Sequence, residues 1–172
     1  MRKNLEIKTR IFNYDVLKWK AREYIKLFTD KQYLIEFQRD IYYKIATGRL
    51  KLRIINGITG NLIYYDRIER NIKRVSNYMI SCTDTPDELR DILKRLYKVQ
   101  VVIEKKREIF ITKNIRIHLD RVKKLGDFLE FEIIYTSYEQ AQKKMNELIK
   151  YFKLNEEEFI KNSYSDLIQK KL

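Results

Sequence analysis

Charged side chains recur two positions apart in this sequence, within stretches whose intervening residues are mostly apolar. Successive side chains of a β-strand point to opposite faces, so residues two apart share a face. The alternation therefore predicts five strands, each with an apolar face for packing and a second face that carries charge. These charged rows are Glu6 and Lys8; Arg49, Lys51 and Arg53; Lys105 and Arg107; Arg116, His118 and Asp120; Glu130 and Glu132.

The chemistry open to these rows depends on where they point. For any single strand the simplest interpretation is a charged face in water, because antiparallel sheets commonly have one solvated face. If the sheet instead closes on itself, the rows line an interior, where like charges are unfavourable unless they bind counter-charge. A basic row would then bind phosphate groups. An acidic row, which offers only oxygen ligands, would bind Mg²⁺ or Mn²⁺ rather than Zn²⁺.

The composition narrows the class of protein. The chain has 172 residues with 37 Lys and Arg against 24 Asp and Glu, and the formal net charge of +13 favours a polyanionic partner. Hydrophobic residues at 44% and charged residues at 35% exclude a disordered chain and a membrane-spanning one. The single Cys82 and single His118 exclude a disulfide framework and a zinc site built from several such residues. We expect one domain over residues 1–172, without a secretory segment and in the cytoplasm.

The elements that must position the charged rows are short strands joined by tight turns. Strands are expected at 4–11, 33–44, 49–55, 62–68, 72–82, 99–106 with an extension towards 112, 115–120 and 128–135. Helices are expected at 15–28, from about 84 to 97, from 137 to 152, and in a short piece from 156. The NGITGN stretch at 56–61 predicts a hairpin turn. This pattern favours an antiparallel α+β fold over a doubly wound sheet.

The same residues, taken in chain order, resemble the CYTH superfamily. That superfamily joins class IV adenylate cyclases and thiamine triphosphatases, and its members are also called triphosphate tunnel metalloenzymes. The resemblance covers nearly the whole chain, from Asn4 to the closing NSYSDLI at 162–168. Its motifs are N-x-E-x-K at Asn4, GRLKLR at Gly48, LIYYDR at Leu62, KKR at Lys105 and HLDRVKKLGDFLEFE at His118. The last string is the most specific part and is closest to the class IV cyclase branch. The resemblance implies a closed eight-stranded antiparallel β-barrel, open as a triphosphate tunnel, with flanking helices and inward-pointing charges.

The resemblance also implies roles for individual residues. Glu6, Glu130 and Glu132 would bind the metal ion. Asp120 would help to bind or position the metal or the attacking group, and Asp120 and Lys8 would be the catalytic residues. The triphosphate would be bound by Lys8, Lys51, Arg53, Arg67, Lys105 and Arg107.

Two positions depart from the family pattern. Asn4 stands where the opening motif has a glutamate, so it can offer a carbonyl oxygen to a metal ion but no charge. Tyr65 stands where a lysine is usual. Arg67 shares the strand face of Tyr65 and could supply the positive charge, although arginine and lysine bind phosphate differently. These departures bear on the reaction and not on the tunnel.

Three functions are compatible with the sequence. The leading one, by resemblance, is a class IV type adenylate cyclase that uses Mg²⁺ or Mn²⁺ to convert ATP to cyclic AMP and pyrophosphate. The alternative is a triphosphatase acting on thiamine triphosphate, inorganic tripolyphosphate, or a nucleoside or RNA 5′-triphosphate. The third is a non-catalytic binder of nucleotides or nucleic acid, which 13 Tyr and 8 Phe beside the basic residues would permit.

The paired carboxylates argue against the binder, because without metal they would repel a phosphate backbone. We therefore expect no nucleic-acid partner beyond an RNA 5′-triphosphate end, and no membrane partner. His118 is either a hydrogen-bonded structural residue or a general base. Class IV cyclases are often dimers, so the resemblance is also compatible with a homodimer.

Overall fold

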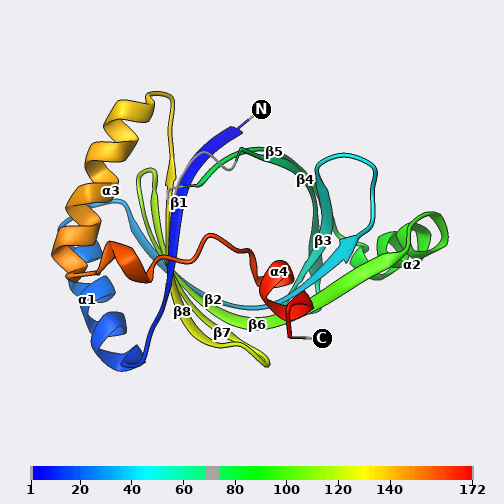
Figure 1. The fold of residues 1–172 in the computed structure, drawn as a ribbon, viewed down its shortest axis with the longest axis horizontal. Coiled ribbons are helices and arrows are strands. Elements are labelled where there is room, and N and C mark those ends of the chain that lie inside the picture. The colour runs from blue at the N-terminus through cyan, green and yellow to red at the C-terminus, as the bar shows by residue number, and fades with distance from the viewer. Residues whose placement is uncertain (1, 69–73, 172) are drawn as a thin grey trace.

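The computed structural model describes residues 2–68 and 74–171, which form a closed eight-stranded antiparallel barrel with helices on its outside (Figure 1). The strands follow one another around the barrel in the order β1-β5-β4-β3-β2-β6-β7-β8, and β8 pairs with β1 to close it. The strands are β1 (Arg2–Arg10), β2 (Lys31–Tyr43), β3 (Arg49–Ile55), β4 (Thr59–Ile68), β5 (Arg74–Thr83), β6 (Val99–Thr112), β7 (Ile115–Val122) and β8 (Gly126–Ile134). The helices are α1 (Tyr14–Lys26), α2 (Pro86–Leu96), α3 (Tyr138–Phe152) and α4 (Tyr164–Gln169), with a 3₁₀ turn, η1, at Glu156–Glu158.

This architecture confirms the predicted α+β class and the closed barrel. The predicted strand limits agree with the observed ones to within a few residues, except that residues 72 and 73 of the fifth predicted strand lie outside the described residues. The predicted short helix from 156 is the 3₁₀ turn η1, and α4 was not predicted from the sequence.

The β3–β4 hairpin sets which side chains of β3 face inward. Asn56 and Gly57 adopt positive φ angles of 54° and 73°, which these two residue types tolerate best. The side-chain oxygen of Asn56 accepts a hydrogen bond of 2.9 Å from the backbone of Phe37, so the turn is tied to β2. The register that follows pairs Lys51 with Tyr42 and Arg53 with Asp40.

The apolar faces of the barrel wall are covered from outside. On one side, α1 and α3 lie over β1, β7 and β8, and their side chains form one buried cluster that includes Ile7, Leu119, Phe131 and Met145 (Figure 1). On the other side, Leu93 of α2 packs with buried residues of β2 and β3. Full burial of such a side chain stabilises the fold by about 1.5–3 kcal/mol. The wall is therefore held from its outer face while charged side chains occupy the inner face.

One end of the barrel interior is filled by α4. Figure 1 shows α4 lying across this end of the barrel. Tyr164 and Ile168 pack among the inward-facing Tyr42, Val101 and Phe128, so apolar side chains close it. Helix α4 begins with a capping box, in which the hydroxyl of Ser163 accepts from the amide of Asp166 and the Asp166 carboxylate accepts from the amide of Ser163. The remaining interior is left for the charged rows.

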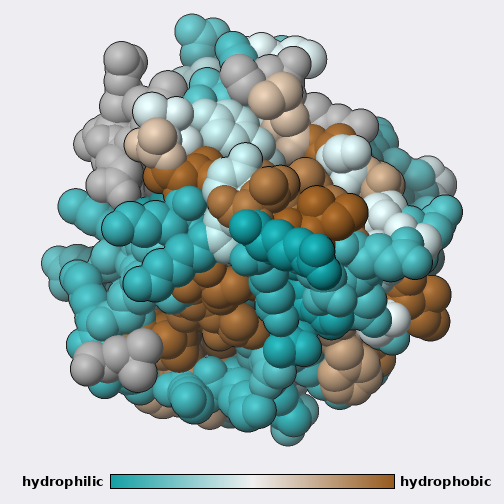
Figure 2. All heavy atoms as spheres, turned by 90° about the vertical axis from the view of Figure 1, so that its right-hand side faces the viewer, coloured by the Kyte–Doolittle hydropathy of each residue, from teal (hydrophilic) through white to brown (hydrophobic). Residues whose placement is uncertain are grey.

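The outer surface that carries α2 mixes hydrophilic and apolar side chains (Figure 2). Ile92 and Leu96 of α2 and Ile58 of the β3–β4 hairpin are exposed. In this view the apolar groups are separated by hydrophilic ones, and scattered exposed apolar side chains are common on protein surfaces. Within the described ranges, no helix has both the length and the apolar character required to span a membrane.

Candidate active site

The barrel encloses a cavity of about 180 Å³ whose wall carries most of the charged residues singled out in the sequence. Of the other predicted residues, Asp120 pairs with Arg107 and does not line the cavity, and the side chain of Arg67 is outside the described part of the chain. The remaining predicted residues line the cavity together, and they come from four strands, β1, β3, β6 and β8: Glu6, Lys8, Lys51, Arg53, Lys105, Arg107, Glu130 and Glu132.

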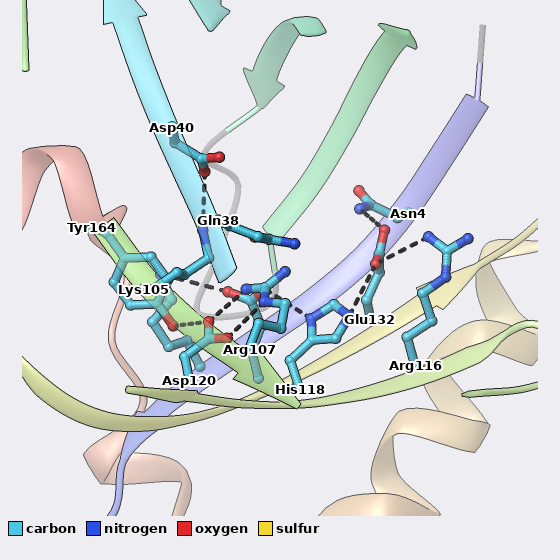
Figure 3. Close-up of polar contacts among 12 residues, drawn as sticks. Asn4, Gln38, Asp40, Lys105, Arg107, Arg116, His118, Asp120, Glu132 and Tyr164 are labelled. Atoms are coloured by element: carbon cyan, nitrogen blue, oxygen red, sulfur yellow. Dashed lines mark hydrogen bonds and ion pairs between the residues drawn. The ribbon is translucent and has the colours of Figure 1, made fainter. Parts of the chain in front are cut away.

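Three cationic side chains converge on one buried carboxylate, Asp40 of β2. Figure 3 shows the contact that Lys105 makes with it. The ammonium nitrogens of Lys51 and Lys105 each lie 3.0 Å from Oδ2 of Asp40. Arg53 donates from Nε to Oδ1 at 2.7 Å and from Nη2 to Oδ2 at 2.8 Å. Burial acts to raise the pKa of Asp40, but the three cations hold it well below its usual range. Asp40 is therefore a permanent anion that fixes the position of all three.

Arg107 of β6 is held in the same way by a second buried carboxylate. Its Nε and Nη2 donate to the two oxygens of Asp120 at 2.6 and 2.5 Å, and Nη2 also lies 3.1 Å from Glu130 (Figure 3). The hydroxyl of Tyr164 donates to Oδ2 of Asp120 at 2.7 Å. Burial and the neighbouring Asp120 raise the pKa of Tyr164 well above its usual value, so the hydroxyl keeps its proton. Both oxygens of Asp120 are engaged, and a bidentate pair of this kind fixes the guanidinium orientation.

The acidic side of the cavity is formed by β1 and β8. Glu6 and Glu132 are directly opposite each other on these strands, which places their Cβ atoms about 4.5–5.5 Å apart. Oε1 of Glu132 accepts from Asn4 at 2.7 Å, while Oε2 lies 3.4 Å from Arg116. His118 of β7 lies between Glu130 and Glu132. Its Nδ1 is 3.2 Å from Oε1 of Glu130, and its Nε2 is 3.8 Å from Oε2 of Glu132. Two carboxylates facing each other across adjacent strands are unfavourable unless a cation compensates them.

The donors on this wall fit a hard divalent cation in type. Carboxylate and amide oxygens are the ligands that Mg²⁺ and Mn²⁺ prefer. Oδ1 of Asn4 is buried and has no hydrogen-bond partner among the described residues, so a cation would satisfy it. In the part of the chain that the structure describes, however, no three carboxylate, imidazole or thiolate groups are grouped so that they could hold a metal ion. In this arrangement the Glu132 carboxylate is engaged by Asn4, Arg116 and His118.

Lys105 is the basic residue whose protonation is most sensitive to this environment. It is 5% exposed, and burial lowers the pKa of its ammonium group to about 7, against the opposing effect of Asp40. A bound polyanion would favour the protonated form. The charged groups that act on its pKa are Asp40, Arg53, Arg107 and Asp120.

This pKa predicts a pH dependence of triphosphate binding. Above pH 7 the free protein must take up a proton at Lys105 when a polyanion binds, so its affinity for tripolyphosphate should fall by up to about tenfold per pH unit. The Lys105→Arg variant stays protonated and should show a shallower slope, while ionisation of the ligand is common to both proteins. Titration calorimetry between pH 6.5 and 9 measures the two slopes, and equal slopes would contradict the assignment.

Two residues that the site uses, Asp40 and Tyr164, were not predicted from the sequence. Asp40 shares its strand face with Gln38 and Tyr42, so the same two-residue spacing could have identified it as inward-pointing. Tyr164 belongs to α4, whose six residues are too few for a helical period to be recognised. The Ser163–Asp166 capping pattern was the available signal.

The chain matches the model of one protein family and is similar in fold to several solved structures. The CYTH domain family model matches residues 2–164. Among solved structures, the PH1012 protein of Pyrococcus horikoshii OT3 is 27% identical with a TM-score of 0.83, covering 97% of this chain and 99% of that one. A proposed adenylate cyclase of Vibrio parahaemolyticus is 20% identical, with a TM-score of 0.75 and coverage of 96% and 97%.

A more distant structure shares the barrel. The triphosphatase of the mimivirus capping enzyme is 16% identical with a TM-score of 0.55, covering 88% of this chain and 89% of that one. At these identities the Vibrio and mimivirus structures show a common fold. A search of curated proteins gives no match.

Proposed function

The chain belongs to the CYTH domain family, and on that premise we propose that it is a metal-dependent enzyme acting on a triphosphate bound inside the barrel. The observation that carries this proposal is the composition of one cavity wall. Basic residues from β1, β3, β6 and β7 face the same space as the carboxylates of Glu6, Glu130 and Glu132. A chain of phosphoryl groups would compensate the charge of the basic residues, and a divalent cation would compensate the charge of the carboxylates.

The basic residues are suited to a triphosphate because they are already positioned. Asp40 holds Lys51, Arg53 and Lys105 through contacts of 2.7 to 3.0 Å, so little side-chain entropy remains to be lost on binding. Preorganised cations stabilise the charge that develops on phosphoryl oxygens without rearranging during the reaction. In this role Lys51, Arg53, Lys105 and Arg107 bind substrate oxygens, while Asp40 and Asp120 act as positioning residues.

The metal ion would be held on the opposite wall by Glu6 and Glu132. Glu130 lies beside them, as does Oδ1 of Asn4, which has no hydrogen-bond partner among the described residues. A bound Mg²⁺ or Mn²⁺ supplies charge neutralisation at the phosphoryl oxygens. Lys8 lies between the two sets: its ammonium nitrogen forms an ion pair of 3.7 Å with Oε2 of Glu130 and donates a hydrogen bond of 3.2 Å to the backbone oxygen of Asn162. This position suits Lys8 to bind an oxygen of the phosphate that leaves.

We propose adenylate cyclisation as the reaction. The ribose 3′-oxygen attacks the α-phosphorus of ATP, the bond to the β-phosphate oxygen breaks, and cyclic AMP and pyrophosphate are released with one proton. The support is the resemblance of the sequence from His118 to Glu132 to class IV cyclases, together with the cavity that Glu130 and Glu132 of this stretch line. We also propose that Arg67, whose side chain is outside the described residues, binds a phosphate group of the substrate.

Product identification tests this proposal. The protein is incubated with ATP, thiamine triphosphate and tripolyphosphate, each with Mg²⁺ or Mn²⁺, and products are separated by anion-exchange chromatography. We expect cyclic AMP and pyrophosphate from ATP, and loss of turnover on addition of EDTA. Formation of diphosphate and phosphate instead would identify a triphosphatase and reject the cyclase assignment. No turnover of any of the three substrates would contradict the enzyme proposal.

A further inference from the structure

Strand β2 is paired along its whole length on one side and along only half of it on the other. Residues 31–43 pair with β6, whereas the pairing with β3 begins at Gln38. No other described strand lies next to β2 in the barrel. Residues 31–36 therefore form an open strand edge at one end of the barrel wall, which we call the free edge.

The main-chain groups that point out of the free edge can be identified from the neighbouring turn. The amide of Phe37 donates to the side chain of Asn56 at 2.9 Å, and its carbonyl oxygen accepts from the amide of Asn56 at 2.8 Å. These groups alternate in direction along an antiparallel strand, and β2 has no register shift over residues 31–42. The amides and carbonyls of Tyr33 and Ile35 therefore point away from β6, where no described residue bonds to them.

The side chains of the free edge are apolar and accessible while the strand itself is held in place. Tyr33, Leu34 and Ile35 are 36%, 43% and 44% exposed. The ring of Tyr33 lies 4.9 Å from the ring of Phe110 on β6, and its hydroxyl donates to Glu108 of the same strand. The free edge is therefore fixed in an extended conformation before it meets any partner.

The free edge lacks the features that keep edge strands apart. Natural edge strands are usually protected by charged residues, by proline or by a bulge. Residues 32–35 have none of these. A further strand placed here would remove apolar area from water and bond the outward-pointing amides and carbonyls.

A second copy of the chain is the partner that fits this edge best. It presents the same free edge, so one antiparallel pairing about a two-fold axis covers both edges at once. A peptide from another protein would cover this edge and expose its own. The net charge of +13 does not oppose the contact locally, because the free edge contains one lysine and one glutamate, Lys31 and Glu36.

We infer that two copies of the chain associate along the free edge, in antiparallel orientation, about a two-fold axis at Leu34. Tyr33 of each copy lies opposite the partner's Ile35, and these two pairs exchange four main-chain hydrogen bonds. The two Leu34 side chains face each other, and an aromatic residue opposite a β-branched one is a favourable cross-strand pair. None of these residues lines the substrate cavity, so the association is independent of the proposed function.

The register follows from the neighbours of Tyr33 and Ile35. A shift of two residues in one direction would place Tyr33 opposite Phe37, whose main-chain groups are already bonded to Asn56. A shift in the other direction would place the charge of Lys31 opposite the apolar side chain of Ile35. The pairing about Leu34 avoids both.

Sedimentation velocity at micromolar protein concentrations tests the association. The wild type should sediment as a dimer. Leu34→Lys should raise the dimer dissociation constant at least about tenfold, because two like charges would lie directly opposite each other. Ile35→Pro should do the same, since proline removes the outward-pointing amide but no hydrogen bond to β6. Circular dichroism checks that the variants fold, and Leu34→Lys, at a half-exposed position, keeps the test valid if Ile35→Pro does not. A monomeric wild type would overturn the inference.

A pair of charge variants tests the register. Leu34→Glu alone should also be monomeric, whereas an equimolar mixture of Leu34→Lys and Leu34→Glu should restore the dimer, because opposite charges then meet at the axis. Ile92→Lys is the control, since Ile92 is an exposed residue of α2 outside the free edge, and this variant should stay dimeric. A mixture that stays monomeric, a dimer that survives Leu34→Lys, or a dimer lost in Ile92→Lys would each overturn the pairing at Leu34.

Discussion

Replacing Asp40 with asparagine should lower the free energy of unfolding by about 3–5 kcal/mol. Asp40 is the shared counter-charge of Lys51, Arg53 and Lys105, and it is only 1% exposed. The amide of asparagine carries no charge, so the three cations would repel one another inside the barrel. Urea denaturation followed by circular dichroism measures the change. The loss should be smaller at pH 9 than at pH 6, because Lys105, with a pKa of about 7, releases its proton.

A polyanion should rescue the Asp40→Asn variant. Tripolyphosphate supplies the negative charge that the carboxylate provided, and a ligand that binds only the folded state raises its stability. The stabilisation on adding tripolyphosphate should therefore be larger for the variant than for the wild type. Asp91→Asn is the matched control, because Asp91 is an exposed aspartate of α2 paired with Arg90. If Asp40→Asn is as stable as Asp91→Asn, Asp40 does not hold the cationic cluster.

The second large effect is expected on activity. Replacing Glu130 and Glu132 together with glutamine should reduce kcat/KM by about 10³-fold or more, because the acidic wall loses the charge that compensates a divalent cation. Binding of Mn²⁺, followed by electron paramagnetic resonance, should be lost in parallel. The Glu104→Gln variant is the matched control, since Glu104 of β6 pairs with Lys123 at the outer surface and does not line the cavity.

A folded double variant with wild-type turnover would reject the metal assignment. Circular dichroism must accompany this measurement, because Glu130 also compensates Arg107 and Lys8. A variant that keeps Mn²⁺ affinity but loses turnover would place the metal elsewhere in the cavity. The two readouts therefore distinguish loss of the ion from loss of the catalytic arrangement.

The inward direction of the charged rows could be predicted because it depends only on local alternation. Lys51 and Arg53 face inward since Leu50, Leu52 and Ile54 between and beside them form the packing face. That rule is a property of the strand itself, so it needs no knowledge of neighbouring strands. The closure of the sheet, in contrast, came from family resemblance, because no local pattern shows that β1 pairs with β8.

The contacts inside the barrel could not be predicted because they depend on the register between strands. Glu6 and Glu132 are far apart in the sequence, and they meet only because β1 and β8 pair in one particular register. Asp40 was overlooked because a single acidic residue within FQRDIYY forms no like-charged pair. Tyr164 reaches Asp120 through a six-residue helix at the end of the chain, which no strand pattern indicates.

Titration calorimetry of tripolyphosphate against three proteins tests the central claim, that the cations inside the barrel bind a chain of phosphoryl groups. The account predicts one binding site in the wild type, and an affinity at least about tenfold lower in Arg53→Met, which leaves Asp40 compensated by Lys51 and Lys105. It predicts wild-type affinity for Arg39→Met, which removes the same charge from the exposed face of β2. Equal affinities for Arg53→Met and Arg39→Met, or no binding by the wild type, would contradict the claim.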